Sequence, residues 1–385
     1  MNIAIITGHF PPSKGGGIAE WALGIARELP KLGHTTSVYV THRKDRDLSI
    51  HKDEKFDCHP MYGRNWHEFH RFYAGYYMWK ILKENPDTVF IVTTWGMAKS
   101  FNFLKKRYPK SKMIVVAHGL EITRLKPSRE LNTMTKVVSS SDLVLSVSKF
   151  TRDEIINRLD SINTNHVKFL PNGVDTNRFF PIEANESFLE KYNIPIGSDL
   201  ILTLARIIKR KAHDDVIRAM PDILSAFPQA HYAIAGPHRK KDPYLYFLKQ
   251  LVKDLSLENH VTFIDFIPDE DLKKIYSVSK VYVMASRTLH ETGDSEGFGI
   301  TFLEANACGC PVIGSYEGGI PDAVENEING LLVPSDSPND ISKAIKKLFS
   351  NEDYRKNIVK KGMERVSNKF TWEKLTIQML DMLNS

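Results

Sequence analysis

Short apolar runs of strand length alternate with longer amphipathic segments along most of the 385-residue chain. In the first half these apolar runs are residues 2–7, 36–41, 89–95, 113–119 and 143–148. In the second half they are residues 199–206, 231–236, 260–266, 281–285, 311–315 and 330–333. Continuous apolar runs are typical of strands buried on both faces, as in parallel sheets. The alternation predicts an α/β chain with two doubly wound, Rossmann-like parallel-sheet domains.

A polar linker with scattered prolines, residues 176–198, separates the two series of apolar runs. It predicts a first domain of residues 1–175 and a second domain of residues 176–365. The remaining residues, 366–385, include an amphipathic run that predicts a closing helix over 370–383. Because open parallel sheets bind ligands beyond the carboxyl ends of their strands, we expect the functional residues there.

A glycine-rich loop follows the first apolar run, and Gly16 and Gly17 stand directly before a segment of helical spacing, residues 18–32. Dinucleotide-binding domains share this order of strand, loop and helix. Their G-x-G-x-x-G fingerprint would need glycine where Glu20 stands. Their acidic ribose ligand would lie near residues 39–42, where the sequence reads Tyr-Val-Thr-His. A nicotinamide-dependent dehydrogenase is therefore disfavoured.

The second half contains a segment, residues 286–321, that leads from an apolar run through a loop into a helix-like stretch. Glu296 and Glu304 lie on either side of a glycine-rich turn and the predicted helix start. A helix start exposes unpaired N–H groups and a partial positive charge, which suit a phosphate. Carboxylates on both sides of a phosphate cradle suit a nucleotide sugar, which has hydroxyls at both ends. Taken alone, each glutamate is more often a solvated helix cap.

The sequence EGFGITFLE at 296–304 and the turn GGIP at 318–321 resemble the donor-site signature of glycosyltransferase family 4. The segments AHG at 117–119 and PNGVD at 171–175 are similar to motifs of the family's first domain. The resemblance implies a GT-B architecture, in which two Rossmann-like domains face a central cleft and the closing helix crosses back to the first domain. It also implies sugar transfer from a nucleotide-sugar with retention of anomeric configuration.

The resemblance assigns roles to individual residues. It implies that Glu296 meets the sugar hydroxyls, that Glu304 holds the ribose and that His118 contacts the sugar near the reacting centre. Arg206 and Lys211 would grip the diphosphate and stabilise its departure, whereas Lys209 and Arg210 either assist or are solvated. Loop amides and one base contact complete the expected donor site: Gly16, Gly17, Phe298, Gly299, Ile300, Thr301 and Phe266.

Two D-x-D runs, residues 45–47 and 269–271, raise the alternative of a metal-dependent transferase. Both stand among charged residues and are interpreted as solvated. Since Arg206, Lys211 and the helix start supply positive potential, no metal ion or other cofactor is expected. The three cysteines form neither a disulfide framework nor a zinc-binding spacing: Cys58, Cys308 and Cys310.

Positive charge is concentrated in the first half, with a net charge of +10 over residues 1–180 and −4 over residues 181–385. This asymmetry suggests an anionic partner such as a membrane surface or a phosphorylated acceptor, and no nucleic-acid motif is present. Residues 61–83 mix aromatic and basic side chains. Phe69, Phe72, Tyr73 and Tyr76 recur at helical spacing, which favours core packing over an interfacial membrane helix.

No apolar run reaches the roughly 18 residues that a membrane span needs, and the first residues do not resemble a signal peptide. We therefore expect a cytoplasmic protein, with contact at the inner face of the membrane left open.

The arrangement SRT…DSEGFGI is similar to that of phosphatidylinositol mannosyltransferases, which favours GDP-mannose as donor and a lipid-linked or glycan acceptor. A UDP-sugar stays open, because only a few contacts select the base. A non-catalytic sugar-nucleotide-binding protein would lose Glu296 or His118, and both are present.

Overall fold

The computed structural model describes residues 1–385 except 13–15, 45, 64–69, 125–128, 160–162 and 239–241. The chain divides into two compact units. The first unit contains Met1–Gly173 and Trp372–Ser385, and the second contains Val174–Thr371. The closing helix α14 (Trp372–Asn384) thus belongs to the first unit, although it follows the second in sequence.

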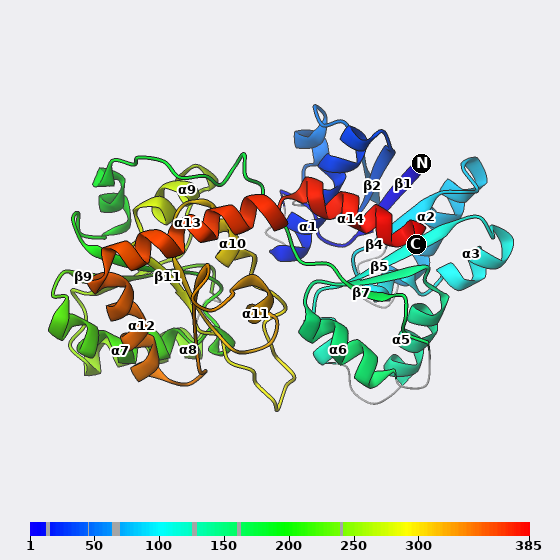
Figure 1. Cartoon of the computed structure of the whole chain (residues 1–385). Coiled ribbons are helices and arrows are strands. Elements are labelled where there is room, and N and C mark those ends of the chain that lie inside the picture. The colour runs from blue at the N-terminus through cyan, green and yellow to red at the C-terminus, as the bar shows by residue number, and fades with distance from the viewer. Residues whose placement is uncertain (13–15, 45, 64–69, 125–128, 160–162, 239–241) are drawn as a thin grey trace. The chain divides into compact units, whose positions relative to one another are not determined.

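Among the described residues, the first unit has a parallel sheet of seven strands in the order β3-β2-β1-β4-β5-β6-β7 (Figure 1). The strands are β1 (Asn2–Thr7), β2 (Thr35–Thr41), β3 (Asp57–Met61), β4 (Val89–Val92), β5 (Lys112–Ala117), β6 (Leu143–Ser146) and β7 (Val167–Phe169). The helices before α14 are α1 (Gly17–Glu28), α2 (His70–Glu84), α3 (Phe101–Arg107), α4 (Leu120–Thr123), α5 (Arg129–Ser140) and α6 (Lys149–Arg158). Short 3-10 turns are η1 (Leu29–Leu32), η2 (Leu48–His51) and η4 (Trp95–Ala98).

The second unit repeats this architecture with six described parallel strands in the order β10-β9-β8-β11-β12-β13. The strands are β8 (Asp199–Leu204), β9 (Ala230–Ala235), β10 (Val261–Ile264), β11 (Val281–Met284), β12 (Val312–Ser315) and β13 (Gly330–Val333). The helices are η5 (Glu186–Tyr192), η6 (Lys209–Lys211), α7 (His213–Ala226), α8 (Pro243–Asp254), α9 (Asp269–Val278), α10 (Ile300–Ala307), α11 (Ile320–Ala323), α12 (Pro338–Ser350) and α13 (Glu352–Lys369). Figure 1 shows α7, α8 and α12 on one side of this sheet and α9, α10 and α13 on the other.

Each sheet is buried between helices, which confirms the predicted α/β class. In the first unit, Ile6 and Phe90 of the sheet pack with Met78 of α2, Phe101 of α3 and Val138 of α5. In the second unit, the corresponding core joins residues of β8 and β11 to α7, α8 and α12: Ile201, Val283, Met220, Leu248 and Ile345. Burial on both faces explains why the strands read as continuous apolar runs.

The edge strand β3 was not predicted from the apolar pattern. Its sequence, DCHPM, is polar and contains Pro60, and only its last residue, Met61, is buried. Proline is tolerated in a sheet at an edge strand, because no further strand needs its missing N–H. An edge position therefore explains both the polar sequence and the missing signal.

The prediction that the aromatic side chains of residues 61–83 pack in the core is wrong for Tyr76, which is 56% exposed. The buried face of α2 is made by Ala74, Met78 and Leu82. Phe69 lies outside the described residues. No helix in the described parts of the chain combines the length and apolar composition needed to cross a bilayer.

The closing helix α14 packs closely against α1 at a glycine, Gly24. A Cβ atom on Gly24 would lie 2.3 Å from the Trp372 ring, so only glycine allows this approach. Gly173 faces the same ring, with a Cβ position 2.7 Å away. The buried Trp372 side chain therefore fixes the start of α14 within the first unit.

Candidate active site

Two loops meet at the carboxyl edge of the second sheet. Strands β8 and β11 are neighbours, paired at Ile201 with Val281 and Leu202 with Tyr282. The loop after β8 contains η6, which ends at Lys211, and the loop after β11 leads through Glu296 into α10. Because the two strands are parallel neighbours, the loops that follow them bring together Lys211 and Glu296, which lie 85 positions apart in sequence.

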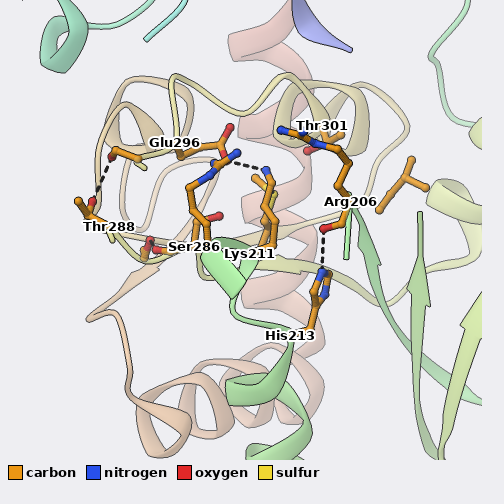
Figure 2. Close-up of polar contacts among 12 residues, drawn as sticks. Arg206, Lys211, His213, Ser286, Thr288, Glu296 and Thr301 are labelled. Atoms are coloured by element: carbon orange, nitrogen blue, oxygen red, sulfur yellow. Dashed lines mark hydrogen bonds and ion pairs between the residues drawn. The ribbon is translucent and has the colours of Figure 1, made fainter. Parts of the chain in front are cut away.

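Glu296 is the centre of a buried ion cluster. Its Oε2 accepts hydrogen bonds from Arg210 Nη1 and from Lys211 Nζ, the latter at 2.5 Å. The side chains of Glu296, Lys211 and Arg210 are only 12%, 10% and 5% exposed. Figure 2 shows the Lys211 and Glu296 side chains pointing toward one another. One carboxylate thus holds two cations, and the cluster keeps a net positive charge.

Burial and charge oppose each other in the pKa values of this cluster. Burial alone would raise the pKa of Glu296, but the charges of Lys211 and Arg210 outweigh it and lower the pKa to about 2. Burial lowers the pKa of Lys211 to about 8, aided by the charge of Arg210 and opposed by Glu296. At neutral pH the carboxylate is therefore ionised and Lys211 is positively charged.

Arg206 lies two residues beyond β8 and is exposed, so its guanidinium is on the surface of this unit. Figure 2 shows the Arg206 side chain extending toward Thr301. The backbone carbonyl of Arg206 is hydrogen bonded to Nε2 of His213, at 3.2 Å. Burial lowers the pKa of His213 to about 4, so this ring is neutral at neutral pH and holds the Arg206 backbone without adding charge.

Gly299 caps the start of α10 with φ +93°, a left-handed conformation that favours glycine. Phe298 is buried, with its ring 6.2 Å from that of Phe370, so its side chain belongs to the core. Thr301 Oγ1 accepts a hydrogen bond from the hydroxyl of the buried Tyr282 at 2.7 Å. The N–H groups that are expected to bind phosphate thus lie at the start of a helix. The buried rings of Phe298 and Tyr282 hold this helix start in place.

The expected donor contacts Glu304 and Phe266 belong to α10 and to the loop after β10. Glu304, on the second turn of α10, accepts a hydrogen bond from the Tyr276 hydroxyl at 2.9 Å. Phe266 follows β10, two strands from β8, and is 55% exposed. Its side chain is therefore not part of the core.

Arg287 forms a second ion cluster, which is connected to the first through the backbone of Arg210. Arg287 Nη2 donates to Asp214 at 3.1 Å and to Asp215 at 2.6 Å, both at the start of α7. The backbone N–H of Arg287 donates to the Arg210 carbonyl at 2.9 Å. Arg287 therefore connects the loop after β11, the turn η6 and the start of α7.

In the first unit, the expected residues lie at the carboxyl edge of the sheet. Gly16 caps α1 with φ +61°, and Gly17 begins that helix. His118 directly follows β5, and its ring makes an edge-to-face contact with that of Trp21 of α1, with ring centroids 6.0 Å apart. Burial, with a smaller contribution from His9, lowers the pKa of His118 to about 3, so His118 is neutral at neutral pH.

The solvated interpretation of the D-x-D runs is wrong for Asp271. This carboxylate is 4% exposed and accepts hydrogen bonds from Tyr192, Lys191 and Lys274, at 2.6, 2.8 and 2.8 Å. Asp47 instead caps a turn by accepting from the Ser49 N–H. Within the described residues, no group of three His, Cys, Asp or Glu side chains is placed to hold a metal ion.

The sequence left the role of Arg210 open and gave no role to several supporting residues of the site, Tyr276 among them. Arg210 belongs to a run of three cations whose outer member, Lys209, is exposed. Only the folded turn distinguishes Arg210 from Lys209. Tyr276 carries no sequence signal, because an apolar-periodic tyrosine in a helix is typical of any core.

Two family models match successive parts of the chain. Residues 15–178 match the model "Glycosyltransferase Family 4", and residues 185–365 match "Glycosyl transferases group 1". The chain thus contains a glycosyltransferase family 4 domain followed by a glycosyl transferases group 1 domain. It is therefore an enzyme of the glycosyltransferase class, and together the two matches span most of its length.

Alignments with similar proteins span nearly the whole length of this glycosyltransferase. The chain is 27% identical over 403 residues to a GDP-mannose-dependent alpha-(1-6)-phosphatidylinositol monomannoside mannosyltransferase of Mycobacterium tuberculosis, covering 99% of this chain and 97% of the relative. A glycosyltransferase structure from Rickettsia africae matches with a TM-score of 0.81 at 20% identity, over 100% of this chain and 97% of the other. Anabaena HepE in complex with UDP also matches with a TM-score of 0.81, at 16% identity over the full length of both chains. The two structural matches show the shared fold.

The ion cluster predicts how stability depends on pH. Replacing Glu296 by Gln leaves Arg210 and Lys211 without their counter-charge and should cost the second unit about 3 kcal/mol at pH 7. Because the pKa of Glu296 is lowered to about 2, its stabilising contribution is present above its usual pKa of 4.5 and is lost as the pH falls from 4.5 toward 2. The difference in melting temperature between wild type and Glu296→Gln should therefore shrink between pH 7 and pH 3.

The matched control is Glu291→Gln, which changes an exposed carboxylate of the same loop. Its melting temperature should follow wild type at both pH values. An equal deficit of Glu296→Gln at pH 7 and pH 3 would contradict the assigned charge state.

Proposed function

We propose that this enzyme is a retaining, metal-independent glycosyltransferase that moves mannose from GDP-mannose to a lipid-linked or glycan acceptor. The observation that carries the proposal is the buried cluster of Glu296, Arg210 and Lys211 beside the start of α10. Its excess positive charge and the unpaired N–H groups of the helix suit a diphosphate. The name of the mycobacterial relative supports the donor and a lipid-linked acceptor.

In this proposal the donor diphosphate is bound by Arg206, Lys211 and the amides of Phe298, Gly299, Ile300 and Thr301. Glu296 orients the sugar hydroxyls, Glu304 accepts hydrogen bonds from the ribose, and Phe266 contacts the base. The neutral His118 and the backbone of Gly16 and Gly17 complete the contacts to the donor. These roles are the ones that the resemblance to the family's motifs implies for the residues at these positions.

Transfer would proceed by cleavage of the bond between the sugar C1 and the phosphate oxygen, with the electron pair leaving on the diphosphate. Arg206, Lys211 and the α10 amides stabilise the negative charge that develops there. The acceptor hydroxyl bonds to C1 from the same face and gives its proton to the departing phosphate oxygen. The products are an α-glycoside and a nucleoside diphosphate, so configuration is retained without a covalent enzyme intermediate.

The charge state of Glu296 supports an orienting role. A carboxylate with a pKa near 2 is a weak base, and its Oε2 is already engaged by two cations. Such a group accepts hydrogen bonds from sugar hydroxyls well, but it removes a proton or attacks C1 poorly. The leaving phosphate is the stronger base available to the reaction.

A UDP-sugar donor is the second candidate, because the fold also matches a structure bound to UDP. Thermal unfolding in the presence of GDP, UDP and ADP and their sugars separates the candidates, since a ligand raises the melting temperature by mass action. We expect the largest shift with GDP or GDP-mannose, both with and without a chelator. A larger shift with UDP would favour the second candidate, and a shift with nicotinamide cofactors alone would contradict a sugar-nucleotide site.

We further propose that the first unit contacts an anionic membrane surface. Tyr76 and Trp79 of α2 and Phe103 of α3 are 56%, 39% and 78% exposed, and the same two helices carry exposed cations. Lys83 Nζ lies 4.3 Å from the centre of the Trp79 ring. Exposed aromatic rings with adjacent lysines suit the boundary between lipid headgroups and acyl chains.

Co-sedimentation with vesicles tests this contact. The enzyme should bind vesicles containing anionic phospholipid at low salt, and high salt should release it because the charges are screened. Combined Trp79→Ser and Phe103→Ser substitution should weaken binding, whereas Tyr246→Ser, which changes an exposed ring of the second unit, should not. Equal weakening by Tyr246→Ser, or no binding at all, would contradict the proposal.

A further inference from the structure

Tyr276 places a hydroxyl group beneath α10 with little freedom to move. Its side chain is fully buried in the second unit. The ring packs against those of Phe179 and Tyr282, whose centroids lie 6.2 and 5.8 Å away. A buried tyrosine hydroxyl needs a hydrogen-bond partner, and here it donates to Glu304 Oε2 at 2.9 Å. The donor is thus fixed by packing, and the acceptor lies on the helix that begins the phosphate cradle.

The charge environment keeps this hydroxyl a donor. Burial and the negative charge of Glu304 raise the pKa of Tyr276 well above its usual value. The phenol is therefore protonated at neutral pH. A hydrogen bond to a carboxylate is stronger than one between neutral groups, so its effect on the orientation of Glu304 is large.

A carboxylate needs such support in order to bind a diol well. The terminal torsion of a glutamate is broad, so an unsupported carboxylate samples many orientations. A ribose presents two adjacent hydroxyls, and a carboxylate can accept about four hydrogen bonds in all. The bond from Tyr276 uses one of these positions and fixes the plane of the group, which lowers the cost of ordering it when a ligand binds.

We propose that Tyr276 is a positioning residue that holds the Glu304 carboxylate in the orientation that accepts the two ribose hydroxyls of the donor nucleotide. This inference rests on the proposed function, in which Glu304 binds the ribose. Tyr276 itself does not touch the donor. Its role is distinct from that of Tyr282, which donates to Thr301 at the phosphate end of α10.

Equilibrium binding of GDP and of 2′,3′-dideoxy-GDP to the full chain tests the proposal. Tyr276→Phe removes one hydroxyl and keeps the ring. It should weaken the binding of GDP by about 10-fold, which is the effect expected of losing one hydrogen bond to a charged group. It should change the affinity for dideoxy-GDP by less than about twofold, because that ligand has no hydroxyls for Glu304. In a Glu304→Gln background, Tyr276→Phe should have no additional effect on GDP binding.

Tyr192→Phe is the matched control. Tyr192 is also buried and donates to a carboxylate, Asp271 Oδ2, at 2.6 Å, but that pair lies outside the proposed donor contacts. The control should leave the affinity for both nucleotides unchanged. Melting temperatures of both variants show whether each protein is folded at the temperature of the binding measurement.

The outcomes separate this inference from the proposed function. Equal weakening of GDP and dideoxy-GDP by Tyr276→Phe, or no weakening of either, overturns the inference while the donor assignment stands. If the wild-type enzyme does not bind GDP, the assignment of the base fails instead. The same comparison with UDP and 2′,3′-dideoxy-UDP then decides the role of Tyr276 by the same criteria.

Discussion

The attraction between one buried carboxylate and two buried cations organises the second unit around its carboxyl edge. Glu296 could not be ionised in this position without Lys211 and Arg210, and the two cations could not be buried together without Glu296. The cluster nevertheless has one cation more than it has carboxylates. Its remaining positive charge lies beside the start of α10, where an anionic ligand would compensate it.

The surrounding fold keeps each charged group in place. Arg287 connects the turn that carries Arg210 to two aspartates of α7, and the neutral His213 holds the backbone of Arg206. Tyr282 and Tyr276 support two residues of α10 from the core. Charged groups are thus positioned by buried neighbours that do not themselves reach the surface. The proposed diphosphate site would therefore be in its binding arrangement before a ligand enters it.

Much of this architecture could be predicted because buried parallel strands produce a strong sequence signal. Asn2–Thr7 and Gly330–Val333 have the bounds that their apolar runs predict. The edge strand at Asp57–Met61 has no such signal, since one of its sides needs no partner. Other predicted strands ended too late, because apolar residues continue into the loops at the carboxyl edge: β8 ends at Leu204 and not at Arg206.

From the sequence, only those site residues could be predicted that belong to a motif or to a characteristic spacing. Glu296 and Lys211 were both expected in the donor site, and the fold does bring them together. Arg210 and Lys209 are chemically alike in sequence, and only the turn η6 buries one and exposes the other. The same limit separates Asp271, which is buried by three partners, from Asp269, whose side chain is 77% exposed. Such differences arise from tertiary contacts that no local pattern contains.

The central proposal is that cationic side chains of the protein, and not a divalent ion, neutralise the departing diphosphate. Turnover of GDP-mannose in the presence of a chelator, compared between wild type, Lys211→Ala and Lys209→Ala, tests it most directly. The account predicts an undiminished rate for wild type and for Lys209→Ala, and a rate about 10²–10³ times lower for Lys211→Ala. Loss of wild-type turnover on chelation, or equal rates for the two lysine variants, would contradict it.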